Sequence, residues 1–242
     1  MEEKMNTFLF DLDGTLLPMD STDKFLEVYL KAVAGKIIPY GYDPNVFIKA
    51  LMTGTNYMIK NDGTMTNEQK FWGEFGKILG VEVEGLVEIF DDFYQNEFEL
   101  ARTTTSTEPL IKECIKLLKD KGYAVGIATN PLFPKAAVHK RINWAGLNPE
   151  DFDHITTYEV SSYAKPNLDY YKEVLTIMGK QPEECIMIGN DVLEDMCAAE
   201  LGMDTFLLTD CLICPEDLEI NHLKQGNYQD LFDMIQKLPN IA

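Results

Sequence analysis

The sequence predicts an α/β protein in which a parallel sheet is combined with an inserted block of helices. From residue 109 onward, short apolar runs alternate with segments of helical periodicity, which is typical of a parallel sheet covered by helices on both faces. One more apolar run, residues 6–12, stands apart from the others because residues 21–100 show helical spacing throughout. The simplest architecture is therefore an α/β core with an all-helical domain inserted after its first strand.

The first predicted strand and the four helices after it follow from local patterns. Residues 6–12 (NTFLFDL) are short and apolar, as in a buried strand. Thr66 and Gln69 have the spacing of a capping box, which marks the start of a helix. Apolar side chains recur at helical spacing in four stretches, at residues 24–34, 47–59, 66–79 and 85–100.

The polar stretch 102–108 (RTTTSTE) is predicted to be a linker between the two parts of the chain. Pro109 opens the next helix, since proline fits the first helical position. We expect residues 1–17 and 103–242 to form the core and residues 18–102 to form the helical domain. The remaining elements of the core are predicted strands at residues 123–129, 154–157, 185–189 and 205–208, and predicted helices at residues 109–121, 135–144, 168–178, 194–201 and 228–237.

The composition is that of a globular protein with a strongly acidic charge balance. Of its 242 residues, 45% are hydrophobic and 25% are charged, and 21 Lys and Arg against 40 Asp and Glu give a net charge of −19. Phosphate backbones and anionic membranes repel such a chain, so we expect no nucleic-acid or membrane partner. A small phosphorylated molecule bound in a locally positive pocket is compatible with this charge.

The sequence also carries expectations about location and assembly. No run approaches the ~18 consecutive apolar residues of a membrane span, and the first residues lack the pattern of a secretory signal. The five cysteines are odd in number and widely spaced, so we expect reduced thiols in a cytoplasmic protein. We expect a monomer or a homodimer.

Four polar clusters follow predicted strands or precede predicted helices of the core. Ligand sites of open α/β sheets form at the carboxyl ends of the strands, so we expect the clusters to share one site. The clusters are Asp11-Leu12-Asp13-Gly14-Thr15, Thr129-Asn130, Lys165-Pro166 and the acidic loop at residues 189–195.

These residue types suit phosphate chemistry with a divalent metal. Asp11 and Asp13 are two residues apart at a strand end, so both carboxylates can face the same crevice. Gly14 relieves the backbone there and is expected to let its N–H approach an anion. Hard oxygen ligands suit Mg²⁺. Lys165 among carboxylates suits a substrate phosphate and favours the ionised form of a nucleophilic aspartate.

Taken in order, the four clusters resemble those of the haloacid dehalogenase (HAD) superfamily, in its phosphatase branch. The resemblance covers essentially the whole chain, and the Asp-x-Asp-Gly-Thr motif behind a strand is its most specific part. It implies a HAD-like Rossmannoid core with a parallel sheet, and for residues 18–102 a C1-type helical cap that closes over the site and selects the substrate. It also implies a Mg²⁺-dependent hydrolase of a small phosphorylated metabolite.

The resemblance assigns a role to each matching position. Asp11 would be the nucleophile that forms an aspartyl-phosphate. Asp13 would protonate the leaving oxygen and then activate a water molecule. Thr129 and the Asn130 backbone N–H would hold the transferred phosphoryl group, and Lys165 would stabilise both the phosphate and Asp11.

The resemblance also implies the metal ligands. Asp191 would bind Mg²⁺ together with the Asp11 side chain and the Asp13 backbone carbonyl. Many relatives have aspartate directly after the glycine of the fourth cluster, where this chain has Asn190. We therefore expect Asp191 to be the ligand, with Asp195 behind it or as an alternate ligand.

Other functions remain open on the sequence alone. A phosphomutase would use the same four clusters, and a phosphonatase would need a cap lysine for a Schiff base, for which Lys24, Lys31 and Lys36 are of the right type. A dehalogenase would not need Asp13. A phospho-aspartate signalling module would not need the helical insert. Sugar phosphates, nucleotides, phosphoglycolate and flavin mononucleotide all remain candidate substrates.

Overall fold

The computed structural model describes residues 5–241 and contains one sheet in which every pair of neighbouring strands is parallel. Residues 1–4, which the sequence assigns to the core, and residue 242 lie outside the described residues. The strands lie in the order β3-β2-β1-β4-β5-β6. Their bounds are β1 Thr7–Phe10, β2 Ala124–Ile127, β3 His154–Ile155, β4 Cys185–Gly189, β5 Asp204–Leu208 and β6 Gln225–Gly226.

The strand order places β1 at the point where the chain changes direction across the sheet. From β1 the chain runs outward through β2 and β3 on one side, and later through β4, β5 and β6 on the other. Phe10, the last residue of β1, pairs with Ile127 of β2 and with Ile188 of β4. Asp11 therefore leaves the sheet at the topological switch point, where ligand sites of such sheets form.

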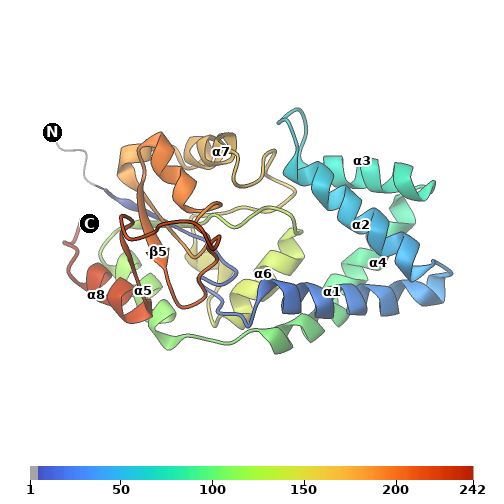
Figure 1. Ribbon diagram of the computed structural model, residues 1–242, viewed down its shortest axis with the longest axis horizontal. Helices are drawn as coiled ribbons and strands as arrows, with labels where there is room; N and C mark the ends of the chain where they lie inside the picture. The colour runs from blue at the N-terminus through green and yellow to red at the C-terminus, as the bar shows by residue number, and fades with distance from the viewer. Residues whose placement is uncertain (1–4, 242) are drawn as a thin grey trace.

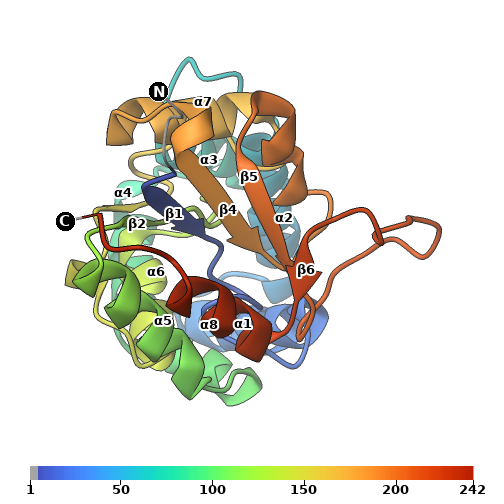
Figure 2. The ribbon, with the colours of Figure 1, turned by 90° about the vertical axis from the view of Figure 1, so that its left-hand side faces the viewer.

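Helices cover both faces of the sheet, as the alternating pattern predicts (Figure 2). Phe8 and Phe10 point to the face that carries α5, α6 and α8, whereas Leu9 points to the opposite face, where it packs with Tyr170 and Tyr171 of α7. The bounds of these helices are α5 Pro109–Asp120, α6 Lys135–Trp144, α7 Leu168–Met178 and α8 Tyr228–Gln236.

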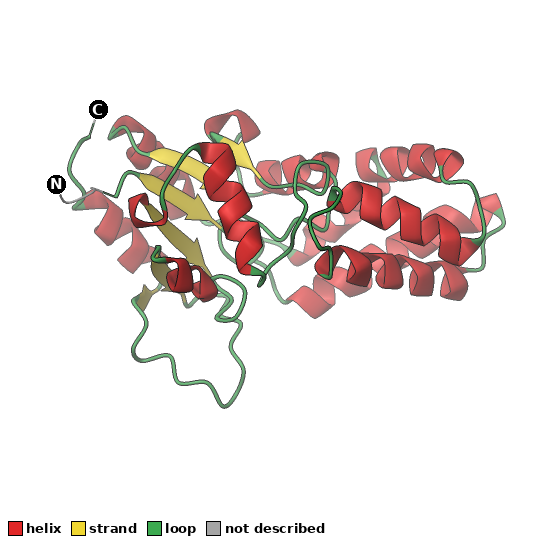
Figure 3. Ribbon diagram, turned by 90° about the horizontal axis from the view of Figure 1, so that it is seen from above, coloured by secondary structure: helices red, strands yellow, loops and turns green. Residues whose placement is uncertain are grey.

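The helices between β1 and α5 form a separate helical lobe at one end of the molecule (Figures 1 and 3). Aromatic side chains fill its interior. The ring centroids of Phe47 and Phe75 lie 5.2 Å apart, and those of Trp72 and Phe90 lie 5.7 Å apart. The elements of the helical lobe are α1 Thr22–Ile37, η1 Ile38–Tyr40, α2 Pro44–Ile59, α3 Asn67–Leu79, α4 Glu84–Gln95 and the 3₁₀ helix η2 Glu97–Thr104.

The start of α3 agrees with the sequence, but the last helix of the helical lobe does not. The Thr66 side chain accepts the Gln69 N–H and the Gln69 side chain accepts the Thr66 N–H, so the predicted capping box is confirmed. The helix predicted over 85–100 is in fact α4 followed by η2. The α-helix ends at Asn96, where φ and ψ are −114° and −82°. The Asn96 side-chain amide donates to the Asp92 carbonyl and carboxylate.

The helix predicted over 194–201 is also wrong, because it is a short 3₁₀ helix, η5 (Met196–Leu201), preceded by a turn. One Asp191 carboxylate oxygen accepts the N–H groups of Leu193 and Glu194, and the Asp195 carboxylate accepts the Asp191 N–H. These side-chain hydrogen bonds fix the backbone of the turn locally. The last cluster is therefore a rigid loop.

The edges of the sheet are shorter than the sequence predicts. The strand expected over 154–157 pairs only at His154 and Ile155, and β6 was not predicted because its two polar residues carry no alternating pattern. Short 3₁₀ helices, η3 (Pro149–Asp151) and η4 (Pro182–Glu184), lead into β3 and β4. Within residues 5–241, no helix combines the length and the apolar character needed to cross a bilayer.

Candidate active site

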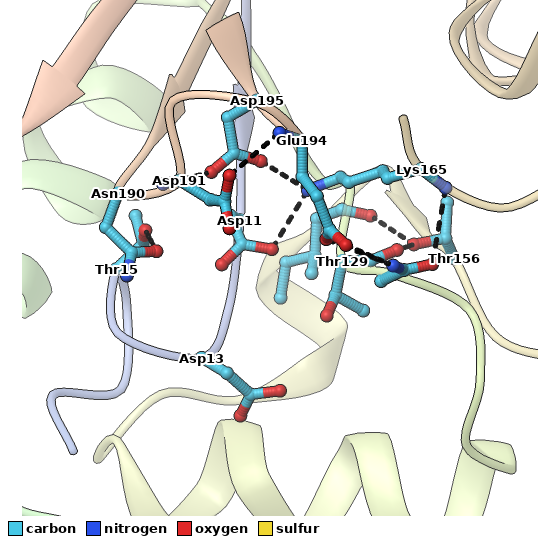
Figure 4. Close-up of polar contacts among 12 residues, drawn as sticks. Asp11, Asp13, Thr15, Thr129, Thr156, Lys165, Asn190, Asp191, Glu194 and Asp195 are labelled. Atoms are coloured by element: carbon cyan, nitrogen blue, oxygen red, sulfur yellow. Dashed lines mark hydrogen bonds and ion pairs between the residues drawn. The ribbon is translucent and has the colours of Figure 1, made fainter. Parts of the chain in front are cut away.

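A buried lysine joins the first and last clusters at the carboxyl edge of the sheet (Figure 4). The Lys165 ammonium lies 3.0 Å from one carboxylate oxygen of Asp11 and 2.6 Å from one of Asp195, and only 1% of Lys165 is exposed. Burial alone would lower the pKa of Lys165, but the two carboxylates together raise it well above its ordinary value. Lys165 is therefore a fixed positive charge that holds Asp11 in place.

Asp195 is fully committed to protein contacts. One of its oxygens binds Lys165 and the other accepts the Asp191 N–H at 2.9 Å. Burial raises the pKa of Asp195, while the charge of Lys165 and the Asp191 N–H oppose that rise. Both Asp195 oxygens have protein partners, so neither is free to bind a metal ion. Asp195 therefore supports Lys165 and Asp191 from behind.

The side chain of Asn190 is also taken up by the protein. Its amide oxygen accepts the Thr15 hydroxyl at 3.0 Å and its NH₂ donates to the Cys211 carbonyl at 2.7 Å. Asp191 is thus the acid of this loop whose second carboxylate oxygen has no hydrogen-bond partner within the described range. This geometry explains why an asparagine can follow Gly189, since the Asn190 side chain is hydrogen-bonded to Thr15 of the first cluster.

Gly14 is required for the shape of the first cluster. Its φ is +84°, which favours glycine, and a Cβ atom at this position would lie 2.4 Å from the Asn190 side-chain nitrogen. Its N–H donates to the Leu17 carbonyl at 2.8 Å. That N–H is therefore used within the turn and does not meet an anion, contrary to the expectation from sequence. The Leu12 N–H, in contrast, has no partner in the part of the chain that the structure describes.

Asp13 lies on the opposite side of Asp11 from Asp195 and pairs with a buried arginine (Figure 4). The partner is Arg141 on α6, whose side chain is 1% exposed and lies 4.6 Å from the centre of the Phe133 ring. Burial raises the pKa of Asp13, Arg141 lowers it, and the nearby Asp11 raises it again. The other Asp13 oxygen is buried without a partner among residues 5–241. No motif in the sequence marks Arg141 as a site residue.

Thr129 and Asn130 lie where the sequence predicts, at the end of β2. The Thr129 carbonyl accepts the hydroxyls of Thr156 and Tyr170, so that the backbone is fixed here. The Asn130 side chain accepts the Lys165 N–H at 3.3 Å and donates to both carboxylate oxygens of Glu194. The Asn130 N–H itself makes no hydrogen bond within the described residues. The second cluster thus connects the third and the fourth.

Glu194 is a second residue that sequence analysis missed. It was included in the acidic loop 189–195 and at the start of a predicted helix but was given no role, whereas its carboxylate accepts hydrogen bonds from Asn130 and lines the same cavity as Asp11. The pKa of Glu194 is raised to about 7, chiefly by burial and also by the charges of Asp191 and Asp11, while Lys165 and Asn130 oppose the rise. The position of the residue, between two acids of an already acidic loop, was the signal in the sequence.

The oxygen atoms at this end of the cavity fit a divalent cation. Lys165 holds one Asp11 oxygen, and neither the other Asp11 oxygen nor the second Asp191 oxygen has a partner within the described range. Oxygen donors of this kind, with retained water, are what Mg²⁺ prefers. No group of three or more His, Cys, Asp and Glu side chains among residues 5–241 could hold a metal ion. A cation here would thus need the Asp13 carbonyl, water or a phosphate oxygen as well as the two carboxylates.

A cavity of about 490 Å³ connects these residues to the helical lobe. Asp11, Asp13, Thr129 and Asp191 line one end of it, and side chains of α1, α2, α3 and α4, together with core residues such as Phe133 and Tyr158, line the rest. Lys165 is not among the lining residues, because it lies behind Asp11. The structure therefore brings together all four predicted clusters, three of them at the cavity wall and Lys165 directly behind it.

Comparison with known proteins agrees with this architecture. The family model of haloacid dehalogenase-like hydrolases matches residues 5–201. The chain is 29% identical over 234 residues to a glyceraldehyde 3-phosphate phosphatase of Methanocaldococcus jannaschii, which covers 95% of this chain and 96% of that protein. It is 26% identical over 188 residues to the pyrophosphatase PpaX of Bacillus cereus, which covers 78% of this chain and 76% of that protein.

A solved structure shows the same fold. A HAD phosphatase from Thermococcus onnurineus superposes on the chain with a TM-score of 0.62 at 18% sequence identity, and the match covers 98% of this chain and 100% of that one. The α/β architecture and the superfamily that the four clusters predict are confirmed. The chain belongs to the haloacid dehalogenase-like hydrolase family.

Proposed function

We propose that the protein is a Mg²⁺-dependent phosphomonoesterase that hydrolyses a small phosphorylated metabolite through an aspartyl-phosphate on Asp11. The observation that carries the proposal is the Asp11–Lys165 pair, which fixes one carboxylate oxygen and leaves the other at the wall of a cavity that Asp13 also lines. The names of the two curated relatives, a glyceraldehyde 3-phosphate phosphatase and a pyrophosphatase, support phosphate hydrolysis.

In the first half of the reaction, the free Asp11 oxygen attacks phosphorus and the bond from phosphorus to the leaving oxygen breaks. Asp13 gives its proton to that oxygen, and the raised pKa of Asp13 favours the protonated form that this step needs. The N–H groups of Leu12 and Asn130 and the Thr129 hydroxyl are available for the phosphoryl oxygens.

In the second half, Asp13 takes a proton from water as the water oxygen attacks phosphorus, and the bond to Asp11 breaks to release phosphate. Lys165 stays charged throughout and stabilises the Asp11 carboxylate as it is regenerated. Asp11, Asp191 and the Asp13 carbonyl would hold the Mg²⁺ ion, which when bound supplies positive charge to neutralise the phosphoryl oxygens. Asp195 is proposed to position Lys165 and Asp191.

The alternative of a phosphonatase loses support from the cavity wall. Its Schiff base needs a lysine at the site, but no lysine lines the cavity in the described part of the chain. Lys24 instead pairs with Asp20 at the surface, and Lys36 pairs with Asp92 and Glu97. We further propose that residues 18–102 act as the cap. A cytoplasmic location and a monomeric or homodimeric state remain predictions.

The proposal is tested by phosphate release from p-nitrophenyl phosphate with Mg²⁺ and with a chelator. We expect activity that requires the metal and that Asp11→Asn abolishes, whereas Asp217→Asn, which changes an exposed aspartate, keeps full activity. Rapid quenching of the unmodified protein with a ³²P-labelled substrate should trap an acid-stable, base-labile acyl phosphate. Activity that survives both chelation and Asp11→Asn would overturn the proposed mechanism.

A further inference from the structure

The wall of the catalytic cavity carries a one-sided charge distribution. Its charged residues are all acids, namely Asp11, Asp13, Asp191, Glu194 and Asp195, and no lysine, arginine or histidine lines it within the described residues. The two nearest cations in the fold, Lys165 and Arg141, are each 1% exposed and are paired with Asp11 and Asp195 and with Asp13 respectively. Apart from the proposed Mg²⁺ ion, which would neutralise the phosphoryl group, no cationic side chain of residues 5–241 is left for a second anionic group of a bound substrate.

The far end of the cavity, inside the helical lobe, is apolar and aromatic. Phe25 and Tyr29 of α1, Met58 of α2, Phe71 of α3 and Tyr94 of α4 all contribute to it. Each of these five side chains is at most 7% exposed, so the wall is part of the interior of the helical lobe. Apolar walls of this kind bind ligands by excluding water from apolar surface.

The polar groups at this end are neutral and few. The hydroxyls of Tyr29 and Tyr94 lie 3.1 Å apart and bond to each other. Burial raises the pKa of Tyr29 to about 12 and that of Tyr94 well above its ordinary value, so neither carries a charge near pH 7. Thr22 and Thr55 add two more hydroxyls. A leaving group with many hydroxyls, such as a hexose, would therefore bury several of them without partners, which costs free energy.

The size of the cavity agrees with a leaving group larger than a second phosphate. A volume of about 490 Å³ is within the range of sites for small organic ligands. An anion at the far end would lie among apolar and neutral side chains with no cationic side chain of the described residues beside it, and an unpaired buried charge is strongly disfavoured.

From this charge distribution and lining we infer that the substrate is the monophosphate ester of an uncharged, largely apolar alcohol. The inference rests on the proposed phosphatase function and deepens it. It separates this chain from an enzyme for pyrophosphate or for phosphorylated carboxylic acids, which carry a second anionic group, and from one for sugar phosphates.

The test compares three alkyl phosphates whose leaving oxygens are of similar type. These are 4-methylbenzyl phosphate, 4-carboxybenzyl phosphate and glycerol 3-phosphate, with pyrophosphate as a fourth substrate. We expect kcat/KM to be highest for 4-methylbenzyl phosphate, by about ten-fold or more over each of the others. The Asp11→Asn variant, assayed in parallel, identifies the activity that belongs to this site.

A charge placed at the cavity mouth tests the cause. Met52 of α2 lines the cavity and is 37% exposed, so a lysine there keeps its ammonium partly in water. Met52→Lys should raise kcat/KM for 4-carboxybenzyl phosphate about ten-fold relative to the uncharged control Met52→Gln, without raising it for 4-methylbenzyl phosphate. Equal values in the two variants would show that charge does not decide the selectivity and would overturn the inference.

The outcomes separate the two proposals. If 4-carboxybenzyl phosphate or pyrophosphate is hydrolysed as fast as 4-methylbenzyl phosphate in an Asp11-dependent reaction, the substrate class is wrong and the phosphatase function stands. If none of the four substrates nor p-nitrophenyl phosphate yields Asp11-dependent phosphate, the phosphatase function fails and the substrate class falls with it.

Discussion

The guanidinium of Arg141 forms an ion pair with the carboxylate of Asp13, although the two residues are 128 positions apart in the chain. Arg141 comes from α6, which contacts α4 and η2 of the helical lobe, and its side chain is only 1% exposed. Its planar group also lies over the Phe133 ring. The arginine therefore fixes the direction in which the proposed acid of the reaction points, which makes it a positioning residue.

Replacing Arg141 should damage the reaction in a way that depends on the leaving group. In Arg141→Gln the Asp13 carboxyl is no longer held, so proton donation to the leaving oxygen becomes inefficient. We expect kcat/KM for phenyl phosphate to fall by about 10²-fold, the usual worth of a positioned general acid. The fall for p-nitrophenyl phosphate should be several-fold smaller, because p-nitrophenolate leaves with little help from an acid.

Two controls keep this prediction specific. Arg141→Lys retains the charge, so it should recover part of the loss with phenyl phosphate. Thermal unfolding of both variants identifies any general loss of fold, which would reduce both substrates equally. An equal fall for the two substrates in a folded Arg141→Gln protein would show that Arg141 does not act through Asp13.

The Lys165–Asp195 pair predicts a strong coupling between two mutations. Lys165→Met should destabilise the fold by roughly 3–5 kcal/mol, because it leaves the buried Asp195 carboxylate without its counter-charge. Adding Asp195→Asn removes that uncompensated charge, so the double variant should recover a large part of the lost free energy of unfolding. Urea unfolding of the wild type, both single variants and the double variant closes the cycle.

Activity should not follow stability in this cycle. The double variant lacks the charge that holds Asp11, so its phosphatase activity should stay at least about 10³-fold below that of the wild type even where its stability is recovered. A double variant no more stable than Lys165→Met would contradict the view that Asp195 is present chiefly to pair with Lys165.

The elements that the sequence pattern predicts well are regular and buried along their whole length, on one face in the helices and on both faces in the strand. The helices over 135–144 and 168–178 and the strand over 185–189 have their predicted bounds. The gathering of the four clusters was also predictable, because parallel strands end at one edge of the sheet. Local patterns could not show where side-chain hydrogen bonds to the main chain end a helix, as at Asn96, or fix a turn, as at Asp191.

The sequence did not predict which residues form ion pairs with the buried charges of the site. Arg141 falls on the same helix face as Ala137 and Val138, which are buried, and a charge in such a position signals a buried pair. Its partner could not be identified, since spacing along a helix carries no information about a residue in a distant turn. The sequence left Asp195 either behind Asp191 or as an alternate metal ligand, because only the folded loop shows that Lys165 and a main-chain N–H occupy both of its oxygens.

The two acids of the last loop should differ in their effect on metal binding. Asp191 has an unpartnered oxygen in the described structure, whereas Asp195 has none. We expect Asp191→Asn to raise the Mg²⁺ concentration needed for half-maximal activity by about 10–100-fold. Asp195→Asn should change this concentration less and should lower the free energy of unfolding more. Magnesium titrations of activity, with calorimetric binding as a second readout, check the order, and the reverse order would reassign the ligand.

Asn67 joins the helical lobe to the core and should control substrate binding. Its side-chain NH₂ donates to the Pro131 and Tyr163 carbonyls, at 3.2 and 3.0 Å, and its own N–H donates to the Ser161 carbonyl. Asn67→Ala leaves two core carbonyls without this donor, at a cost of about 1–3 kcal/mol. We expect KM for an apolar substrate to rise several-fold with a smaller change in kcat. Gln69→Ala, which disturbs the same helix start without touching the core, is the matched control.

His154 predicts how the fold responds to acid. Its Nε2 is buried without a partner in residues 5–241, and burial lowers its pKa below the ordinary value of 6.5. The unfolded chain therefore binds a proton more readily than the folded one, so the stability that neutral His154 permits above pH 6.5 is lost as the pH falls through its lowered pKa. His154→Phe removes both the titration and the unpaired nitrogen. The variant should gain Tm over the wild type at pH 5, with a smaller gain at pH 8, and His222→Phe, at an exposed position, is the matched control for replacing a histidine by phenylalanine. A Tm difference between His154→Phe and the wild type that stays constant from pH 5 to pH 8 would show that His154 does not take part in acid unfolding.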